Sequence, residues 1–286
     1  MKLNVITARF SKALCVLILT VTACFWGCER ESETSSSLPE MPPIGEDFFQ
    51  DVSPYSGIDF THTFGDDLLS NVAETVGSGA AFLDYDNDGL MDLYVANGSF
   101  SEQFSESEKP RELPKNRLYR NVGSGQFRDV TDDAGVGDTG FSSGVSVADY
   151  DNDGYPDIYI CNYGPNRFYH NNGDGTFTDV AEELGVRGED ENFTIAAVWL
   201  DYDLDGLLDL YVANYLDYDP AYNLFYSPDG YPGPLNFDGQ PDTFYRNLGN
   251  GQFEDLTEEL GLYREDGRAM GVGTTDYNHD GYPDIY

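Results

Sequence analysis

The sequence predicts an all-β protein, a β-propeller assembled from four-stranded antiparallel blades. Two sequence elements recur in the same order after residue 48, and copies of the first begin 52 to 75 residues apart. Each complete repeat holds four short runs rich in aromatic and β-branched residues, separated by Gly-rich turns. No segment keeps a helical periodicity. Four-stranded repeats of this length are typical of propeller blades, whereas the coils of a solenoid, the second interpretation, are shorter and more regular.

The first repeated element has the form Asp-x-Asp-x-Asp-Gly-x-x-Asp and leads into a short apolar strand. Its four copies occupy residues 84–92, 149–157, 201–209 and 276–284. The chain ends two residues after the fourth copy, so it supplies about three and a half blades. We therefore expect this sequence to be the N-terminal part of a longer protein.

The second element spans Asn116–Phe127 in the first repeat and continues into an Asp-Val-Thr-like strand and a closing Gly. It returns at Asn166–Phe177 and Asp242–Phe253 with the same internal spacing. The segment Phe49–Gly57 matches only the end of this element, and we expect it to give a strand to the last blade of the ring. The four strands predicted for the first repeat are Ala80–Asp84, Leu93–Ala96, Leu118–Asn121 and Phe127–Thr131.

The first element predicts a cation site in each repeat. Its carboxylates stand at positions 1, 3, 5 and 9 of a tight loop and repel one another unless a cation lies among them. The Gly at position 6 permits the sharp turn, and the backbone carbonyl at position 7 adds a fifth oxygen. Oxygen donors on a flexible loop favour Ca²⁺ over Mg²⁺, and no nearby His or Cys attracts zinc. The predicted ligands are Asp84, Asp86, Asp88, Leu90 and Asp92 in loop 1; Asp149, Asp151, Asp153, Tyr155 and Asp157 in loop 2; Asp201, Asp203, Asp205, Leu207 and Asp209 in loop 3; and Asp276, Asn278, Asp280, Tyr282 and Asp284 in loop 4.

Two other interpretations of the loops are weaker. An EF-hand needs a Glu at position 12 and flanking helices, but position 12 is Val95, Ile160 or Val212 inside a predicted strand. A solvated acidic turn explains one such loop more readily than four copies at constant spacing. His279 lies between two ligand positions, and its side chain is expected to point away. We expect one structural Ca²⁺ in each loop, bound more weakly in loop 4 because Asn278 is neutral.

The two elements together resemble known repeats. The loops are similar to those of FG-GAP/VCBS repeats, the calcium-bearing blades of integrin α-subunit propellers, and the resemblance covers about residues 48–286. The runs Asp-Leu-Tyr-Val-Ala-Asn and Asn-Arg-Leu-Tyr-Arg-Asn-x-Gly resemble the cartilage acidic protein group, whose bacterial members often carry a C-terminal ASPIC/UnbV module. The resemblance implies a propeller, commonly seven-bladed, with Asp84, Asp86, Asp88, Asp92 and their counterparts as calcium ligands.

The N-terminus predicts export. Residues 1–24 have a basic start and an apolar run too short to span a bilayer, and they end in Val-Thr-Ala-Cys24, which resembles a bacterial lipobox. We expect lipidation of Cys24, with Cys28 or an ordinary cleaved signal as the alternatives. Residues 25–47 read as a flexible tether. The expected location is the bacterial outer membrane or cell surface, or otherwise the secreted fraction, with membrane contact only through the lipid.

The charge of the chain limits its partners. The formal net charge is −37, from 52 acidic and 15 basic residues, which argues against nucleic acid and anionic membrane surfaces. Such acidity often marks disorder, but aromatic residues make up 14% of this chain, too many for a solvated tail. We therefore expect many of the acidic residues to have a role inside a folded domain.

Antiparallel blades place the predicted calcium loops and Gly hairpins on one face and the variable insertions on the opposite face. The insertions are Ser99–Lys115 and Leu216–Pro241. The second carries aromatic residues among Pro, Gly and Asp, which suits a protein or carbohydrate ligand. The alternative is a loop folded over its own blade. These aromatic residues are Tyr218, Tyr222, Phe225, Tyr226 and Tyr231.

These features predict a non-catalytic binding or adhesion module at the cell envelope. The alternative is an enzyme, a calcium-dependent polysaccharide lyase or hydrolase on a propeller scaffold, and a purely structural assembly part is a third class. The three histidines, His62, His170 and His279, fall in no Ser/His/Asp-like pattern. Cys161 occupies a position held by Ala in sister repeats and is expected to be a small buried residue rather than a catalytic thiol.

Overall fold

The computed structural model describes residues 49–64, 71–101, 109, 111–221 and 230–286, which all belong to one compact unit, Leu38–Tyr286. The predicted signal peptide with Cys24, and the tether over residues 25–47, lie outside the described residues. Within the described ranges, no helix combines the length and the hydrophobicity that crossing a membrane requires.

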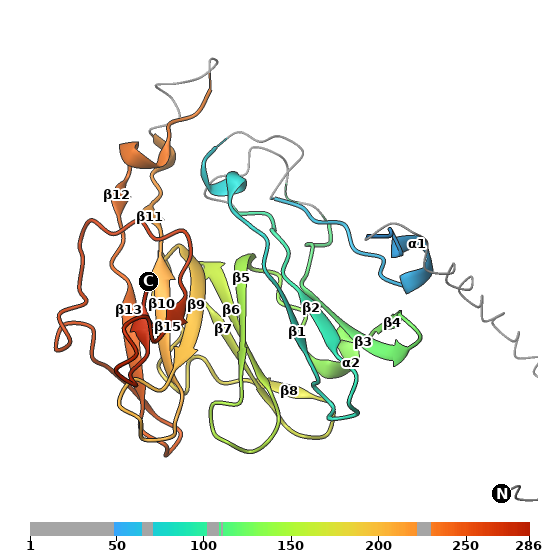
Figure 1. Cartoon of the computed structure of the whole chain (residues 1–286). Helices are drawn as coiled ribbons and strands as arrows, with labels where there is room; N and C mark the ends of the chain where they lie inside the picture. Colours follow the sequence, from blue (N-terminus) through green and yellow to red (C-terminus); the bar gives the residue numbers. More distant parts are fainter. Residues whose placement is uncertain (1–48, 65–70, 102–108, 110, 222–229) are drawn as a thin grey trace, which may run out of the picture. The chain divides into compact units, whose positions relative to one another are not determined.

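The described residues form three four-stranded antiparallel sheets, which we call blades 1, 2 and 3 (Figure 1). In each blade the strands pair in chain order, as predicted. Blade 1 holds β1 (Ala80–Leu83), β2 (Asp92–Val95), β3 (Arg117–Gly123) and β4 (Gln126–Asp129). Blade 2 holds β5 (Phe141–Ala148), β6 (Asp157–Tyr163), β7 (Arg167–Asn171) and β8 (Phe177–Asp179). Blade 3 holds β9 (Thr194–Leu200), β10 (Asp209–Asn214), β13 (Thr243–Asn247) and β14 (Phe253–Asp255).

Shorter elements complete the described chain. β15 (Thr274–Thr275) and β16 (Asp284–Ile285) pair as the first two strands of a fourth repeat. β11 (Leu216–Asp217) and β12 (Asp238–Gly239) pair inside the second insertion, which also contains the one-turn η3 (Pro234–Asn236). The remaining single turns are α1 (Ser53–Ser56), η1 (Ala73–Thr75) and α2 (Thr131–Ala134). The prediction of an all-β fold built from antiparallel blades is confirmed.

The core lies between blades. β5 packs between β1 of one neighbour and β9 of the other, so the first strands of the three blades lie next to each other (Figure 1). Tyr94 and Leu118 of blade 1 are fully buried against Ile158 and Ile160 of blade 2. A second cluster joins blades 2 and 3 in the same way and contains Cys161, which is buried as predicted. Alternating strand residues thus bury one face of each sheet against its neighbour.

Each repeat ends in a helical turn closed by a left-handed glycine. In blade 1, α2 is followed by Gly135 at φ 78°, and Gly185 and Gly261 repeat this conformation in blades 2 and 3. Phe49–Gly57 contains the same device, because α1 is followed by Gly57 at φ 76°. Its first residues form no strand within the described chain. The match is therefore to the closing turn, and a strand contributed to the last blade stays a prediction.

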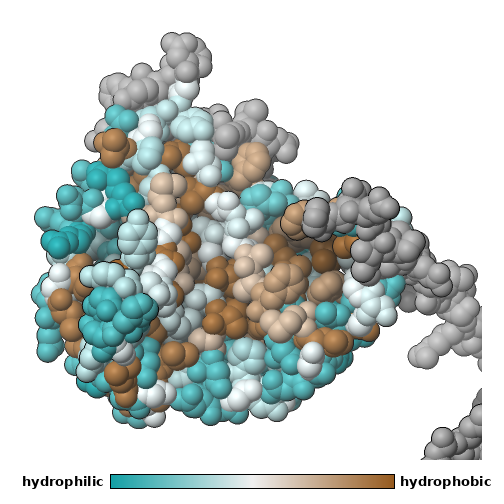
Figure 2. Space-filling model, in the orientation of Figure 1, coloured by the Kyte–Doolittle hydropathy of each residue, from teal (hydrophilic) through white to brown (hydrophobic). Residues whose placement is uncertain are grey.

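The two faces of the blades differ as predicted. The acidic turns between first and second strands lie at the lower edge of Figure 1, and β11 and β12 lie at the upper edge. In Figure 2, hydrophilic residues gather along that lower edge, and hydrophobic residues lie in the middle of the view.

The described part of the second insertion covers its own blade. Tyr218 and Phe237 are 6% and 2% exposed and pack with Phe193 and Tyr215, and Tyr231 is half-buried against the same cluster. Tyr222, Phe225 and Tyr226 lie outside the described residues. For Tyr218 and Tyr231 the alternative interpretation, a loop folded over apolar surface, is the observed one.

Candidate metal centres

Each acidic loop is shaped by its own carboxylates. In loop 1, Asp84 at position 1 accepts hydrogen bonds from the backbone N–H groups of Asp88 and Gly89, at 3.0 and 2.9 Å. Asp88 at position 5 accepts one from Leu90 at 2.9 Å. Loops 2, 3 and 4 repeat all three bonds. Short Asp side chains favour such local bonds, which explains why the spacing of the element is constant.

Two positions of each loop have left-handed backbone. The Gly at position 6 does so as predicted, at φ 84° in Gly89 and between 90° and 93° in the other loops. Position 4 is also left-handed and is not Gly in any loop: Asn87 has φ 55° and Asn152 has φ 58°. These two asparagines donate to the carbonyls of Gly154 and Gly206 in the next loop, at 2.9 and 3.1 Å. Loops 1, 2 and 3 are therefore tied in a row.

Loop 3 has Leu204 at this left-handed position, with φ 62° and 53% exposed. A branched aliphatic residue is strained there, and Asn is tolerated because its short polar side chain suits the conformation. We expect Leu204→Asn to stabilise the protein by about 1 kcal/mol, measured by denaturant unfolding. Asn87→Leu is the matched reverse substitution and should destabilise. Equal midpoints for all three proteins would contradict this account.

The Asp at position 9 is buried and braces the loop against the third strand. Asp92 accepts the N–H of Tyr85 on Oδ2 at 3.1 Å and the N–H of Asn121 on Oδ1 at 2.7 Å. Asp157 and Asp209 do the same in their blades. Both carboxylate oxygens are used, by donors from two different elements. Only a carboxylate satisfies both, which explains why Asp occupies this position in each complete blade.

Burial makes the charge at position 9 costly. Burial raises the pKa of Asp92 and of Asp209 to about 6, although the backbone hydrogen bonds that these carboxylates accept lower it. Burial also raises the pKa of Asp157. A nearby divalent cation favours the ionised form and offsets this cost.

The carboxylates at positions 1, 3 and 9 converge in three loops. One oxygen from each of Asp84, Asp86 and Asp92 lies within 4.8 Å of the others, and the counterparts in loops 2 and 3 form equivalent clusters. At position 3, Asp86 Oδ1 and Asp203 Oδ1 are buried and make no hydrogen bond within the described chain. A buried carboxylate oxygen without a donor fits a metal ligand. The donor set is all oxygen, which suits a hard cation.

The other predicted ligand positions are placed as follows. The position-5 side chains lie outside these clusters in loops 1 and 3, where their Oδ1 atoms close the local turn. The position-7 residues Leu90, Tyr155, Leu207 and Tyr282 each donate their N–H to that turn. Loop 4 keeps the same turn bonds, and its Asn278 donates to Asp280 at 3.0 Å. The carbonyl ligands and loop 4 therefore stay predictions.

Basic side chains that sequence reasoning missed reach two of the loops from the third strand. Arg120 on β3 contacts Asp86 at 2.7 Å and Asp88 at 3.0 Å. Arg246 on β13 contacts Asp203 in the same manner. The signal was present in the sequence, because both arginines occupy the fifth position of the second repeated element.

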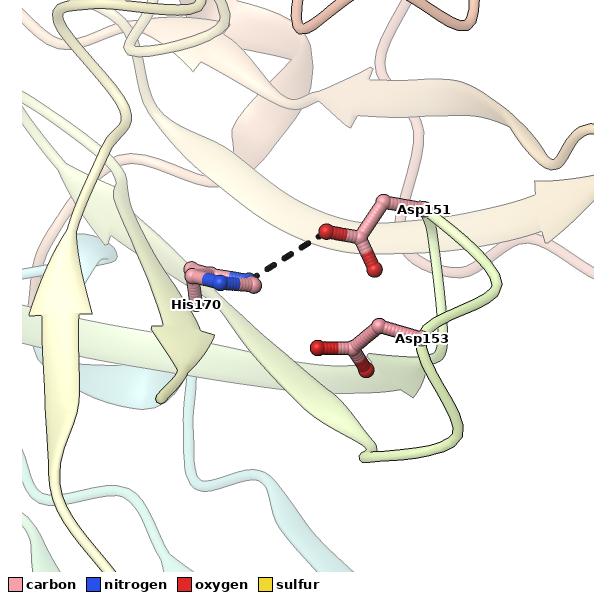
Figure 3. Close-up of side chains that lie close together, drawn as sticks. All are labelled: Asp151, Asp153 and His170. Carbon is pink, nitrogen blue, oxygen red and sulfur yellow. Dashed lines mark ion pairs between the residues drawn. The ribbon is translucent and has the colours of Figure 1, made fainter. Parts of the chain in front are cut away.

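Blade 2 has a histidine at this position. His170 Nδ1 on β7 lies 3.1 Å from Asp157 Oδ1 and 3.7 Å from Asp151 Oδ2. Figure 3 shows the imidazole directed at Asp151, with Asp153 beside it. The expectation that no His lies near the loops is wrong for loop 2, because antiparallel pairing places β7 next to β6. His279 in loop 4 is exposed.

Burial in the metal-free protein predicts a pH dependence. Because folding raises the pKa of Asp92 and Asp209 from 3.8 to about 6, their contribution to stability is present below pH 3.8 and is lost as the pH rises through 6. A cation that binds the ionised form reverses the trend. We expect the increase in unfolding temperature caused by calcium to be larger at pH 8 than at pH 5, measured by calorimetry at both values. An increase that shrinks toward pH 8 would contradict this.

The fold and these loops define a β-propeller-type repeat protein with acidic turns whose carboxylates converge. A family model described as FG-GAP-like repeat matches residues 84–160, 149–212 and 229–286. These matches cover more than half of the chain, which therefore belongs to the FG-GAP-like repeat family. No curated protein matches the chain. The first two matches begin at position 1 of loops 1 and 2, and each of the three matches includes at least one acidic loop. The narrower resemblance to the cartilage acidic protein group stays an inference from its motifs.

Proposed function

We propose that this protein is a calcium-stabilised, exported binding module of the cell envelope without catalytic activity. The observation that carries the calcium assignment is the buried, unpartnered oxygen of Asp86 and Asp203 within all-oxygen carboxylate clusters. Loops of this kind favour Ca²⁺, because Mg²⁺ requires tighter octahedral geometry and retains its waters. Positions 1, 3 and 9 hold the ion, with position 5 and the carbonyl of position 7 completing the set.

Bound calcium would cancel the repulsion among carboxylates and fix the turns at one end of the blades. The row of bonds from Asn87 to Gly154 and from Asn152 to Gly206 then joins the fixed turns to one another. A rigid end leaves the opposite end, with both insertions, as the surface for partners. Scaffolded loops are a common place for recognition.

Calorimetric titration of metal-free protein tests the metal assignment. We expect at least three Ca²⁺ per chain and no comparable heat with Mg²⁺ at the same concentration. Asp84→Ala removes the position-1 ligand and should reduce the number of sites by one. A titration without Ca²⁺ uptake would overturn the proposal.

A glycan array together with a polysaccharide-degradation assay tests the binding role. A binding module retains a ligand without turning it over. Turnover that is lost on changing an acidic residue of the insertion face would favour the alternative, a calcium-dependent polysaccharide lyase or hydrolase.

Export rests on the sequence of residues 1–24. Expression of the full chain in a bacterium should yield a protein that partitions into detergent, and Cys24→Ser should abolish this partitioning. Mass spectrometry of the mature N-terminus separates lipidation at Cys24 from lipidation at Cys28 and from ordinary cleavage. Retention of the intact N-terminus in the cytoplasm would refute export.

A further inference from the structure

A groove of about 1120 Å³ lies at the outer edge of blade 3, where the crossing from blade 2 meets β13, β14 and the ends of the second insertion. We call it the acidic groove. None of the described residues that line it is Lys or Arg. Its acidic lining includes Glu189, Glu191, Asp217, Asp255, Glu258 and Glu259.

The corresponding places in blades 1 and 2 each contain an arginine. Arg117 on β3 donates to Asp129 Oδ2 at 2.8 Å. Arg167 on β7 donates to Asp179 Oδ2 at 3.0 Å and also contacts Asp138, on the crossing from blade 1, at 3.3 Å. In blade 2 the guanidinium bridges β8 and the crossing that precedes the blade. In blade 1, Arg117 lines a smaller groove of about 270 Å³ together with Asp59 and Phe60.

Blade 3 has Thr243 where the other blades have arginine. The strand registers show the equivalence, because Arg117, Arg167 and Thr243 pair with Val95, Ile160 and Val212 at the same point of the second strand. A threonine side chain is too short to reach across the groove. The place that a guanidinium occupies in blades 1 and 2 therefore holds no basic side chain in blade 3.

The aspartate partner of the missing arginine is retained. Asp255 Oδ1 accepts from the N–H of Thr257 at 2.9 Å, as Asp129 Oδ1 accepts from Thr131. In blades 1 and 2 the Oδ2 atom of this aspartate receives the arginine, and blade 3 keeps the carboxylate without that donor. Tyr245 and Tyr263 add aromatic rings to the lining, and Tyr263 is 47% exposed. Aromatic faces beside carboxylates favour an organic cation.

A metal ion does not suit this groove. Among the described residues, the carboxylate clusters with three ligand atoms within 4.8 Å of one another all lie at the acidic loops. The acids of the groove are more widely spaced and suit separate contacts along an extended basic ligand. A planar guanidinium matches a carboxylate through paired donors better than an ammonium does.

We propose that the acidic groove binds an arginine side chain of a basic partner polypeptide, whose guanidinium occupies the place of the arginine that blade 3 lacks. This inference deepens the proposed binding function by naming the chemistry of the partner and the place where it binds. It does not depend on which ion occupies the loops, because the groove and its counterparts are built from other residues.

Fluorescence polarisation with a labelled hexa-arginine peptide tests the proposal, with hexalysine and a Gly-Ser peptide for comparison. The full chain is used at about 150 mM NaCl, so that the large net charge is screened. The decisive variant is Thr243→Arg, which copies blades 1 and 2 and fills the groove from within. The matched control is Thr178→Arg on β8, which adds the same charge at an exposed position outside the groove.

We expect Thr243→Arg and Asp255→Asn each to weaken hexa-arginine binding at least about tenfold, the loss expected for a charge-assisted hydrogen bond, and Thr178→Arg to change it less than about twofold. Hexalysine should bind more weakly than hexa-arginine. Absence of peptide binding, or equal effects of Thr243→Arg and Thr178→Arg, would overturn the proposal. Calcium stoichiometry measured on the same samples distinguishes failure of the groove proposal from failure of the metal assignment. Absence of peptide binding with intact calcium uptake would contradict only the groove proposal.

Discussion

Excess chelator is expected to lower the unfolding temperature of the purified protein by about 15 °C or more. Each site filled at about a hundredfold over its Kd adds about 2.7 kcal/mol to the free energy of unfolding. The unfolding temperature of a domain of this size changes by about 2–4 °C per kcal/mol. At least three carboxylate clusters contribute. Without the ion, position-9 carboxylates remain buried among other acids, and their raised pKa values show that this charge is costly.

The measurement is a thermal melt followed by circular dichroism in saturating calcium, in excess EGTA, and in EGTA with calcium restored. Magnesium at the same free concentration is the matched control and should recover much less of the shift. Melts that coincide in calcium and in EGTA would remove the physical basis of the proposed function. A drop that calcium does not restore would indicate damage unrelated to the loops.

The blade pattern could be predicted from sequence because it depends on local rules. Constant spacing in the loops reflects bonds within a few residues, such as Asp84 to Gly89, and Gly-rich hairpins follow from turn geometry. The four predicted strands of blade 1 match β1 to β4 to within about two residues at most ends. Each repeat encodes these features independently, so three copies confirm one another.

The features that could not be predicted from the sequence depend on contacts between elements. Arg120 and His170 reach the loops only because the third strand pairs beside the second, and their side-chain directions follow from register. The burial of Tyr218 follows from apolar surface on blade 3 that a single sequence does not display. The closing turn in Phe49–Gly57 was matched correctly, whereas the strand expected of this segment stays a prediction, because a strand needs a partner that local sequence does not specify.

The side chains that reach the loops from the third strand bear on how tightly each proposed site would hold a cation. Arg120 and Arg246 place a permanent positive charge against positions 3 and 5, where it competes with a cation for the same carboxylates. Loop 2 has His170 at this position instead of an arginine. Loop 2 is therefore the loop in which substitutions test the roles of individual carboxylates without a competing arginine.

Within loop 2, Asp157→Asn is expected to destabilise the protein both in calcium and in chelator, whereas Asp151→Asn should destabilise it only in calcium. Asp157 uses both oxygens to accept N–H groups, from Tyr150 at 3.2 Å and from Asn171 at 2.8 Å. An amide supplies one acceptor and turns a donor toward the other N–H, a loss of about 1–3 kcal/mol for the buried group left unpaired. The missing ligand adds to this loss when calcium is present.

Asp151 is the matched control because it sits in the same loop and undergoes the same substitution. Burial and the charge of Asp153 raise its pKa, so its ionised form is unfavourable without a cation. In chelator at pH 8, Asp151→Asn should therefore melt at or above the wild-type temperature, and in calcium it should melt below it, with Ca²⁺ affinity at loop 2 reduced by on the order of tenfold. Urea unfolding of the three proteins in both conditions decides the matter. If both substitutions lowered stability equally in chelator, the carboxylate at position 3 would have a bracing role like that at position 9, and its assignment as a metal ligand would fail.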